Sequence, residues 1–362
     1  MAAIGGHGRF VKKYYLIIVL FPAVAASGHQ LRLPLQYDRY LPWSARSLGM
    51  GSAAVAGGGA SALFGQPDRT GGLERWEAGV SSAALSAGRS HVSIESEASR
   101  AAPSAAAAAF RLGGHVLAFG CRRAVDVRIS FPDVYAPLLS DHAALELDQA
   151  VLGWAYSTAG NASIGFSLGA SRAGFDWRGP DRAYAAGEAS GFGFSAGLTI
   201  PVTGEIKLSL AAAAKSELKG TADFLPDPAA GDLELSGAVP SRTAAAVEYR
   251  PETGLILVAE AAMSGWNTVT QGYEGRIDLH LGAEVQIIEA LALRLGGFTM
   301  TSPLDEYERR LDATLRDGYF LTAGLGLSCK GFYLDLGGAS SRPLSGGGQS
   351  QNRLAVSAGF GR

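Results

Sequence analysis

The sequence is poor in cysteine and in charge, and beyond its first residues it has no long apolar run. Its two cysteines, Cys121 and Cys329, are too few and too far apart for a disulfide framework or a zinc site, although one bridge between them stays open. Charged residues make up 18% of the chain, and the net charge of −2 comes without a basic stripe for nucleic acid. No later stretch offers the ~18 consecutive apolar residues of a transmembrane helix. These absences argue against disulfide-rich scaffolds, nucleic-acid-binding proteins and helical membrane proteins.

The chain begins with the pattern of a secretory signal peptide. Basic residues between positions 9 and 13 precede the apolar run 14–21, and the small residues 23–26 follow. The run is shorter than the ~20 residues that span a bilayer, so we expect cleavage near Ala25 and removal of residues 1–25. An exported chain with 49 glycines and 47% apolar residues is expected to be a soluble secreted β protein or an outer-membrane barrel.

From residue 76 onward the apolar residues recur with a period of two, as in strands with one apolar face. In 277–286, for example, the odd positions are apolar and the even positions mostly polar. The alternation predicts fourteen strands, at 76–97, 104–111, 115–125, 146–158, 162–176, 190–200, 203–219, 239–250, 254–267, 276–287, 290–301, 317–329, 332–341 and 351–360.

The connections between these strands are short and long in turn. Short ones, such as 113–114 and 330–331, alternate with long ones, such as 126–145 and 302–316. Short periplasmic turns and longer extracellular loops are typical of a transmembrane β-barrel, whereas a soluble sandwich has no reason to alternate. We therefore predict an all-β fold, a transmembrane antiparallel barrel of about fourteen strands over residues 76–362.

The polar faces of the strands predict a charged lumen, because unpaired charges would destabilise a sandwich core but are normal inside a barrel. The candidate lumen residues are Lys207, Lys215, Glu248, Glu260, Asp278, His280, Glu284, Arg294 and Asp335. Aromatic residues near strand ends predict a girdle at the membrane surfaces, with ordinary core aromatics as the alternative. They are Trp76, Trp154, Tyr249, Trp266, Tyr273, Tyr319 and Phe320.

Catalytic and metal-binding motifs are missing from the sequence. The stretch 49–54 matches a loose dinucleotide-binding pattern, but it lacks a preceding strand and a βαβ context. The six histidines do not pair at metal-ligand spacing, and we find no nucleophile elbow and no Walker loop. We expect no enzyme, no cofactor and no metal site.

Three segments of the chain resemble the outer-membrane long-chain fatty acid and hydrocarbon transporters of the FadL and TodX type. They are 191–224, 239–267 and 281–304, and they follow one another in the family's order. The stretch from Ser44 to Asp68 is similar to the family's N-terminal hatch, a plug inside the barrel. It keeps "ARSLGMG" and "ASALF" but has Gln66-Pro67-Asp68 where the family has Asn-Pro-Ala. The resemblance implies a hatch over residues 26–75.

The hatch gives the candidate gate residues, which are Leu48, Met50, Leu63, Phe64, Gln66, Pro67 and Asp68. The resemblance implies passive uptake of long-chain fatty acids or other hydrophobic small molecules, which leave sideways through the wall after the hatch rearranges. From the residues, the apolar loop 127–147 fits a landing patch, with a loop packed on its neighbours as the alternative. Its candidates are Ile129, Phe131, Val134, Tyr135, Leu138 and Leu139, with Leu145 and Leu147 at its end.

The resemblance leaves two other functions open. PorV-type barrels share the start at 45–51 and act as secretion or attachment partners, so a periplasmic or secreted protein partner is an alternative to solute transport. A general diffusion porin is the third hypothesis, although a hatch inside the barrel argues against a wide pore. The expected location is the outer membrane of a Gram-negative-type bacterium, with the lipid bilayer and a hydrophobic ligand as partners.

Overall fold

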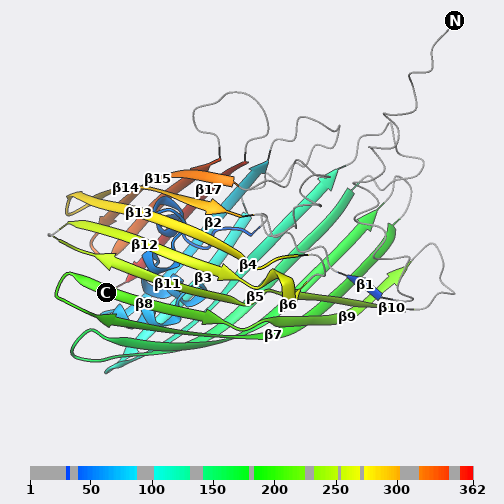
Figure 1. Cartoon of the computed structure of the whole chain (residues 1–362), viewed down its shortest axis with the longest axis horizontal. Coiled ribbons are helices and arrows are strands. Elements are labelled where there is room, and N and C mark those ends of the chain that lie inside the picture. The colour runs from blue at the N-terminus through cyan, green and yellow to red at the C-terminus, as the bar shows by residue number, and fades with distance from the viewer. Residues whose placement is uncertain are drawn as a thin grey trace, which may run out of the picture.

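The strands close into one ring around a set of short helices (Figure 1). The computed structural model describes residues 30–32, 40–87, 102–130, 142–178, 183–224, 232–251, 254–269, 273–301, 318–341 and 351–361. The N-terminal elements are β1 (Gln30–Arg32), α3 (Ala45–Gly49), η2 (Ala54–Ala56), η3 (Gly59–Phe64) and η4 (Pro67–Gly72). The strands that follow are β2 (Trp76–Ala87), β3 (Ala102–Leu112), β4 (His115–Ser130), β5 (His142–Ser157), β6 (Ser163–Arg178), β7 (Ala183–Pro201), β8 (Ile206–Ala213), β9 (Ser216–Phe224), β10 (Asp232–Val239), β11 (Arg242–Tyr249) and β12 (Leu255–Ser264). The chain then forms η7 (Trp266–Thr268), β13 (Arg276–Ile288), β14 (Leu291–Met300), β15 (Gly318–Cys329), β16 (Phe332–Ser340) and β17 (Gln351–Gly361).

The ring has fourteen antiparallel strands, as predicted. β8 and β9 are two halves of one strand, because both pair with β7, and β10 and β11 are halves of the next. β17 pairs with β2 over its whole length and closes the ring. The predicted strand 203–219 therefore begins at Ile206, is interrupted between β8 and β9, and continues to Phe224. Pro240 lies at the second interruption, where a residue without a backbone N–H cannot join the ladder.

All the short connections lie at one end of the barrel, which we call the turn end. Gly113 in the β3–β4 turn has φ of 65°, and Lys330 and Gly331 between β15 and β16 have φ of 50° and 87°. Positive φ at both central residues gives a turn that matches the twist of the two strands it joins. The first residue of β2 and the last of β17 are at this end, so the chain enters and leaves the barrel on one side.

The outer surface of the ring is apolar and the inner surface is largely polar. Exposed outward side chains include Phe119, Leu168, Phe194, Leu281 and Leu295, each at least 45% exposed. A continuous apolar band of this kind is stable in lipid and unstable in water. The girdle prediction is wrong for Trp266 and Phe320, because both are 2% exposed and point inside. Among the described residues no helix is long and apolar enough to cross a membrane.

On one side the wall extends further at the end opposite the turns. β4, β5 and β6 have 16 residues and β7 has 19, more than the ~9–11 that cross a bilayer. In this extension the faces are reversed, because charged pairs such as Arg123–Asp148 and Arg172–Glu188 lie outside. The inner face is apolar, with Leu147 fully buried. The extension therefore encloses a buried apolar cluster above the polar lumen.

Candidate solute-binding site

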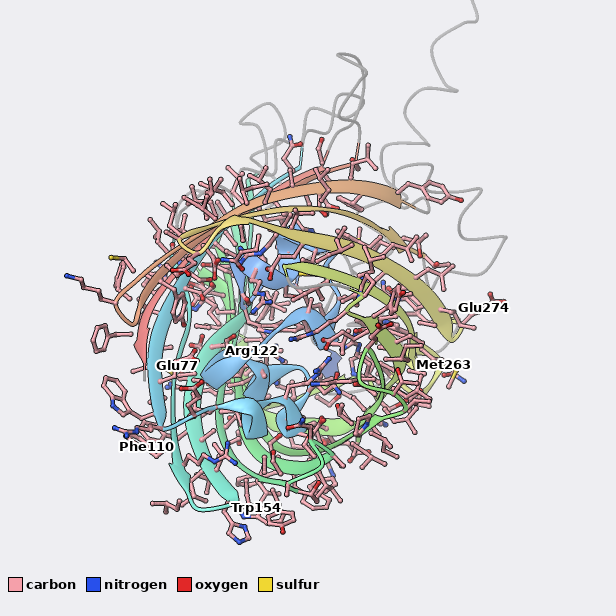
Figure 2. The ribbon with its side chains drawn as sticks, turned by 90° about the vertical axis from the view of Figure 1, so that its left-hand side faces the viewer. Glu77, Phe110, Arg122, Trp154, Met263 and Glu274 are labelled. Atoms are coloured by element: carbon pink, nitrogen blue, oxygen red, sulfur yellow. The ribbon has the colours of Figure 1, made fainter. Side chains whose placement is uncertain are left out.

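Residues 40–73, which we call the lumen segment, lie inside the ring and fill its turn-end half (Figures 1 and 2). Ser44 starts α3 by accepting a hydrogen bond from Ser47 N–H, and the rest of the segment forms 3₁₀ turns. Small residues fit this form, because several turns must pack in a lumen too narrow for large side chains. The sequence comparison with the hatch pattern thus pointed to residues that are inside the barrel.

The lumen segment fits because the wall carries glycine where the segment touches it. A Cβ at Gly282 would lie 2.5 Å from the backbone oxygen of Met50, and one at Gly120 would lie 2.7 Å from the Phe64 ring. The same holds where the segment meets other strands, at Gly153, Gly165, Gly197, Gly296, Gly324 and Gly337. From the sequence, close packing was attributed to the glycines of the lumen segment, and the contribution of the wall glycines was missed. Their signal was available, since they lie at inward positions of the predicted strands.

Charged and polar wall residues hold the lumen segment in place. Arg46 Nη2 donates to Glu284 Oε1 at 2.9 Å, and Arg69 Nη2 donates to Glu248 Oε2 at 2.7 Å. Val55 N–H donates to Glu260 Oε2 at 3.1 Å and Ala60 N–H donates to Glu77 Oε1 at 3.2 Å, so wall carboxylates reach the segment at four separate points.

The structure places the other predicted lumen residues on the inner wall as well. His280 Nδ1 lies 2.8 Å from the carbonyl oxygen of Gly51, and Asp278 pairs with Arg276 at 2.7 Å. Asp335 and Glu284 both pair with Arg294, which is 6% exposed. One prediction differs from the structure, because Lys215 lies exposed at the β8–β9 interruption, where its partner is Glu217.

The predicted gate residues divide between apolar clusters and a polar anchor. Leu48, Met50 and Leu63 are each about fully buried, at 0%, 1% and 1% exposed, in three different clusters, and Phe64 is half-buried. Gln66, Pro67 and Asp68 are buried against β6 and β7.

Asp68 is a fully buried carboxylate. Its Oδ2 accepts from Thr199 Oγ1 at 2.6 Å and from Ser163 Oγ at 3.2 Å, whereas Oδ1 is buried without a partner among the described residues. Burial raises the pKa of Asp68, and the hydroxyl of Thr199 and the charge of Arg69 oppose that rise.

Above the lumen segment lies the buried apolar cluster of the wall extension, which we call the chamber. Its buried side chains come from six strands and are Ala124, Val125, Leu145, Leu147, Ala173, Ala189, Leu218, Ala222 and Leu235. The prediction that Leu145 and Leu147 belong to a loop is wrong, because β5 begins at His142 and both point inward. Ile129 lies in β4, and Phe131, Val134, Tyr135, Leu138 and Leu139 fall outside the described residues.

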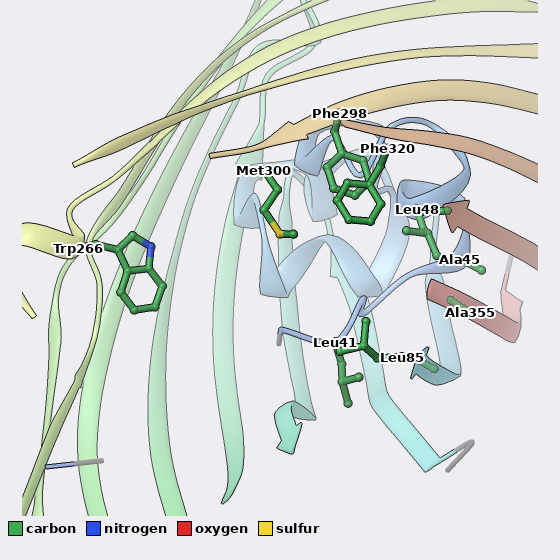
Figure 3. Close-up of a cluster of buried hydrophobic side chains, with 11 residues drawn as sticks. Leu41, Ala45, Leu48, Leu85, Trp266, Phe298, Met300, Phe320 and Ala355 are labelled. Carbon is green, nitrogen blue, oxygen red and sulfur yellow. The ribbon is translucent and has the colours of Figure 1, made fainter. Parts of the chain in front are cut away.

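A second apolar cluster continues the chamber across the lumen (Figure 3). The rings of Phe298 and Phe320 stack at 4.6 Å, with Met300 beside them and Leu48 of the lumen segment next to the pair. The guanidinium of Arg353 lies 5.3 Å from the Phe320 ring. Tyr40 packs against both clusters and links them.

Two polar side chains, Arg122 and Tyr40, lie beside these apolar clusters and have few polar partners. Arg122 donates from Nε to Gln149 Oε1 at 2.7 Å, and it forms no ion pair with a described carboxylate. Its guanidinium lies 5.3 Å from the Trp43 ring and 5.6 Å from the Phe64 ring. The Tyr40 hydroxyl is buried with no partner among the described residues. Burial raises the pKa of Tyr40 to about 12, although Arg122 and Arg276 act against it, so this hydroxyl remains a donor.

Sequence reasoning did not find Arg122. The adjacent Arg123 points outward and pairs with Asp148, Glu146 and Asp126, so two neighbouring arginines have opposite environments. Only the pairing of β4 with its neighbours tells them apart.

Beside the lumen segment a cavity of about 300 Å³ runs toward the turn end. Its upper boundary includes Trp43 and Phe64, and its lower boundary includes Gln286 and Ser328, close to the β13–β14 and β15–β16 turns. Arg46, Arg294, Glu77, Glu284 and Asp335 line its sides, together with small residues such as Ala107 and Ala292.

Solved structures with the same architecture include two toluene transporters and a FadL homologue. The Ralstonia pickettii toluene transporter TbuX aligns with a TM-score of 0.66 and 14% identity over 90% of this chain and 99% of its own. A Pseudomonas aeruginosa FadL homologue aligns at 0.69 and 14%, again over 90% and 99%. The P. putida toluene transporter TodX aligns at 0.64 and 12%, over 90% and 99%.

The chain has the FadL-type fold.

No protein-family model matches the sequence, and the search of curated proteins found no match. At this identity the likeness shows the FadL-type fold and leaves the ligand to be argued from the residues of this chain.

Two further features of this FadL-type barrel concern metals and thiols. No group of three or more possible metal ligands occurs in the part of the chain that the structure describes. Cys121 and Cys329 are unpaired and exposed, on β4 and β15, so the bridge that the sequence left open is not formed.

Proposed function

We propose that this protein is an outer-membrane channel for the passive uptake of hydrophobic small molecules, with the lumen segment as its plug. The outward apolar band supports the membrane location. The short turns at the turn end indicate that this end faces the periplasm. The observation that carries the proposal is the reversal of the wall extension, which is charged outside and apolar inside. A buried apolar cluster above the membrane offers hydrophobic molecules a place where they are removed from water.

The polar groups of the chamber favour a ligand with one anionic head, such as a long-chain fatty acid. A carboxylate would supply the acceptor that the Tyr40 hydroxyl lacks, and the anionic partner that Arg122 lacks, among the described residues. Charge-assisted hydrogen bonds to a guanidinium are short and strong in an apolar setting. The hydrocarbon tail would lie against the side chains of the chamber, as the solute of a pre-formed apolar pocket does.

The test compares Arg122→Gln with the neighbouring control Arg123→Gln. A lost charge-assisted hydrogen bond costs about 1.5–3 kcal/mol, so Arg122→Gln should weaken fatty-acid binding roughly ten- to hundredfold. Arg123 lies outside the barrel, so its variant should bind as the wild type does. Isothermal titration calorimetry with a long-chain fatty acid and with the matching alkane separates the contribution of the carboxylate head to the affinity from that of the tail. If Arg122→Gln weakened the binding of both ligands equally, the assignment of the head would be wrong.

The alternative function is that of a PorV-type attachment or secretion partner. The departure at Gln66-Pro67-Asp68 from the hatch pattern motivates it. A protein that co-purifies in fixed ratio, together with no binding of any apolar ligand to the purified barrel, would favour this alternative.

A further inference from the structure

The cavity beside the lumen segment begins where the chamber ends. Trp43 and Phe64 form part of its upper boundary, and both rings lie against the guanidinium of Arg122, which precedes Ala124 and Val125 of the chamber on β4. One layer of side chains therefore separates the chamber from the cavity. Below that layer the cavity continues to Gln286 and Ser328 at the turn end.

The break in the wall next to the chamber is occupied by the chain itself. β3 pairs with β4 up to Ala105–Arg122, and beyond this point β4 bonds instead to the lumen segment. Leu41 N–H donates to the carbonyl oxygen of Ala124 at 2.8 Å, and Tyr40 bridges Val125. On the other side β1 pairs in parallel with β10, which has no described pairing to β12. Both edges that could open sideways are thus bonded, while the cavity is open space.

The lining of the cavity suits an amphiphile in transit. One side has apolar groups, including the Trp43 and Phe64 rings, Ala107 and Ala292, against which a tail can lie. Arg46 offers a second guanidinium, whose side chain is 31% exposed and whose Nε has no partner among the described residues. Three carboxylates, Glu77, Glu284 and Asp335, face two arginines, so the cavity is net negative. A carboxylate at Arg46, which is already paired with Glu284, is therefore held less tightly than one at Arg122.

We propose that the solute leaves to the periplasm through this cavity, along the lumen segment, when the layer of Trp43, Phe64 and Arg122 parts. Arg122 is the upper binding group for the anionic head, and Arg46 is the lower one. This proposal rests on the proposed function, because it takes the same amphiphile as its ligand.

The test fills the cavity with a side chain and leaves the chamber intact. Ala292 lines the cavity and is 6% exposed, whereas Leu293 is next in the chain, faces outward and is 44% exposed. Ala292→Trp should abolish uptake of a radiolabelled long-chain fatty acid by cells that lack another such channel, with the Kd for the same fatty acid unchanged. The matched control Leu293→Trp should keep both. Ser328→Trp, at the exposed mouth of the cavity, repeats the block where folding tolerates a large residue.

The outcomes separate this proposal from the one on which it rests. Normal uptake in Ala292→Trp and Ser328→Trp, with both variants folded, would overturn the periplasmic exit and point to a sideways one. Equal loss of uptake in the Leu293→Trp control would also overturn it, because the block would then not belong to the cavity. If the wild type binds no fatty acid, the proposed function itself fails.

Discussion

At the scale of single residues, the fit between wall and lumen segment depends on missing side chains. Gly282 and Gly296 of the wall lie against the backbone of Met50 and Gly51, where a Cβ has no room. Gly174 is also in the wall, but a Cβ there would meet nothing within 4 Å. The same residue type is therefore required at one position and free to vary at the other.

This contrast gives a stability prediction. Gly282→Ala should destabilise the barrel by about 1–3 kcal/mol, the usual cost of an overpacked core, because the wall or the lumen segment has to shift. Gly174→Ala should leave stability unchanged. Thermal unfolding followed by the change in electrophoretic mobility of the folded barrel measures both. Equal melting temperatures for the two variants would show that the segment is loosely held.

Asp68 gives a prediction with a definite sign in pH. Its pKa is raised by burial, so its contribution to stability is largest at low pH and is lost as pH rises through the raised value. Asp68→Asn removes the carboxyl group whose ionisation causes this loss of stability. It keeps a side-chain oxygen that can accept from the hydroxyls of Thr199 and Ser163. The variant should therefore gain melting temperature over the wild type at pH 8 and show no gain near pH 4. Asp223→Asn, at an exposed site on β9, is the control. A constant difference across this pH range would contradict the prediction.

At the scale of elements, most strands were predictable because alternation carries through them. The predicted strand 276–287 is β13, Arg276–Ile288, almost residue for residue. The two interruptions were not predictable, since the period of two says nothing about which neighbour each half pairs with. Trp266 was placed in a strand but lies in η7, because a 3₁₀ turn after Ser264 points the indole inward.

The site was predictable only in part. The hatch resemblance located residues 44–68. The alternation of polar and apolar residues located Glu260, Glu284 and Asp335 on the inner wall. The chamber was missed, because the faces of β4 and β5 exchange polarity along their length. The β4 ladder shifts register between Arg123 and Val125, which is a non-local feature of pairing with β5.

The lumen segment as an element gives a conductance prediction. Its helices fill the turn-end half of the barrel, and four wall carboxylates bond to it. Deleting residues 44–68 should open the lumen to ions and raise single-channel conductance in a planar bilayer. A conductance equal to that of the wild type would contradict the role of this segment as a plug.

At the scale of the whole molecule, the barrel has two kinds of interior stacked along its axis. The upper one is apolar and built from the wall extension, and the lower one is polar and occupied by the lumen segment. Arg122 lies at the boundary between them. A molecule with a long tail and one charged end matches both interiors in turn, whereas a neutral hydrocarbon matches only the upper one.

The position of the lumen segment also bears on how the barrel is made. The segment precedes β2, which closes the ring by pairing with β17, and it bonds to opposite walls, through Ala45 N–H to Ser357 on β17 and through Asp68 to Thr199 on β7. Its backbone is bonded to the strands that complete the ring, so we expect the seam between β2 and β17 to form around a segment already in place. Barrel closure and loading of the lumen are then a single step of assembly, and a chain that closed empty would have no way to correct the error without reopening that seam.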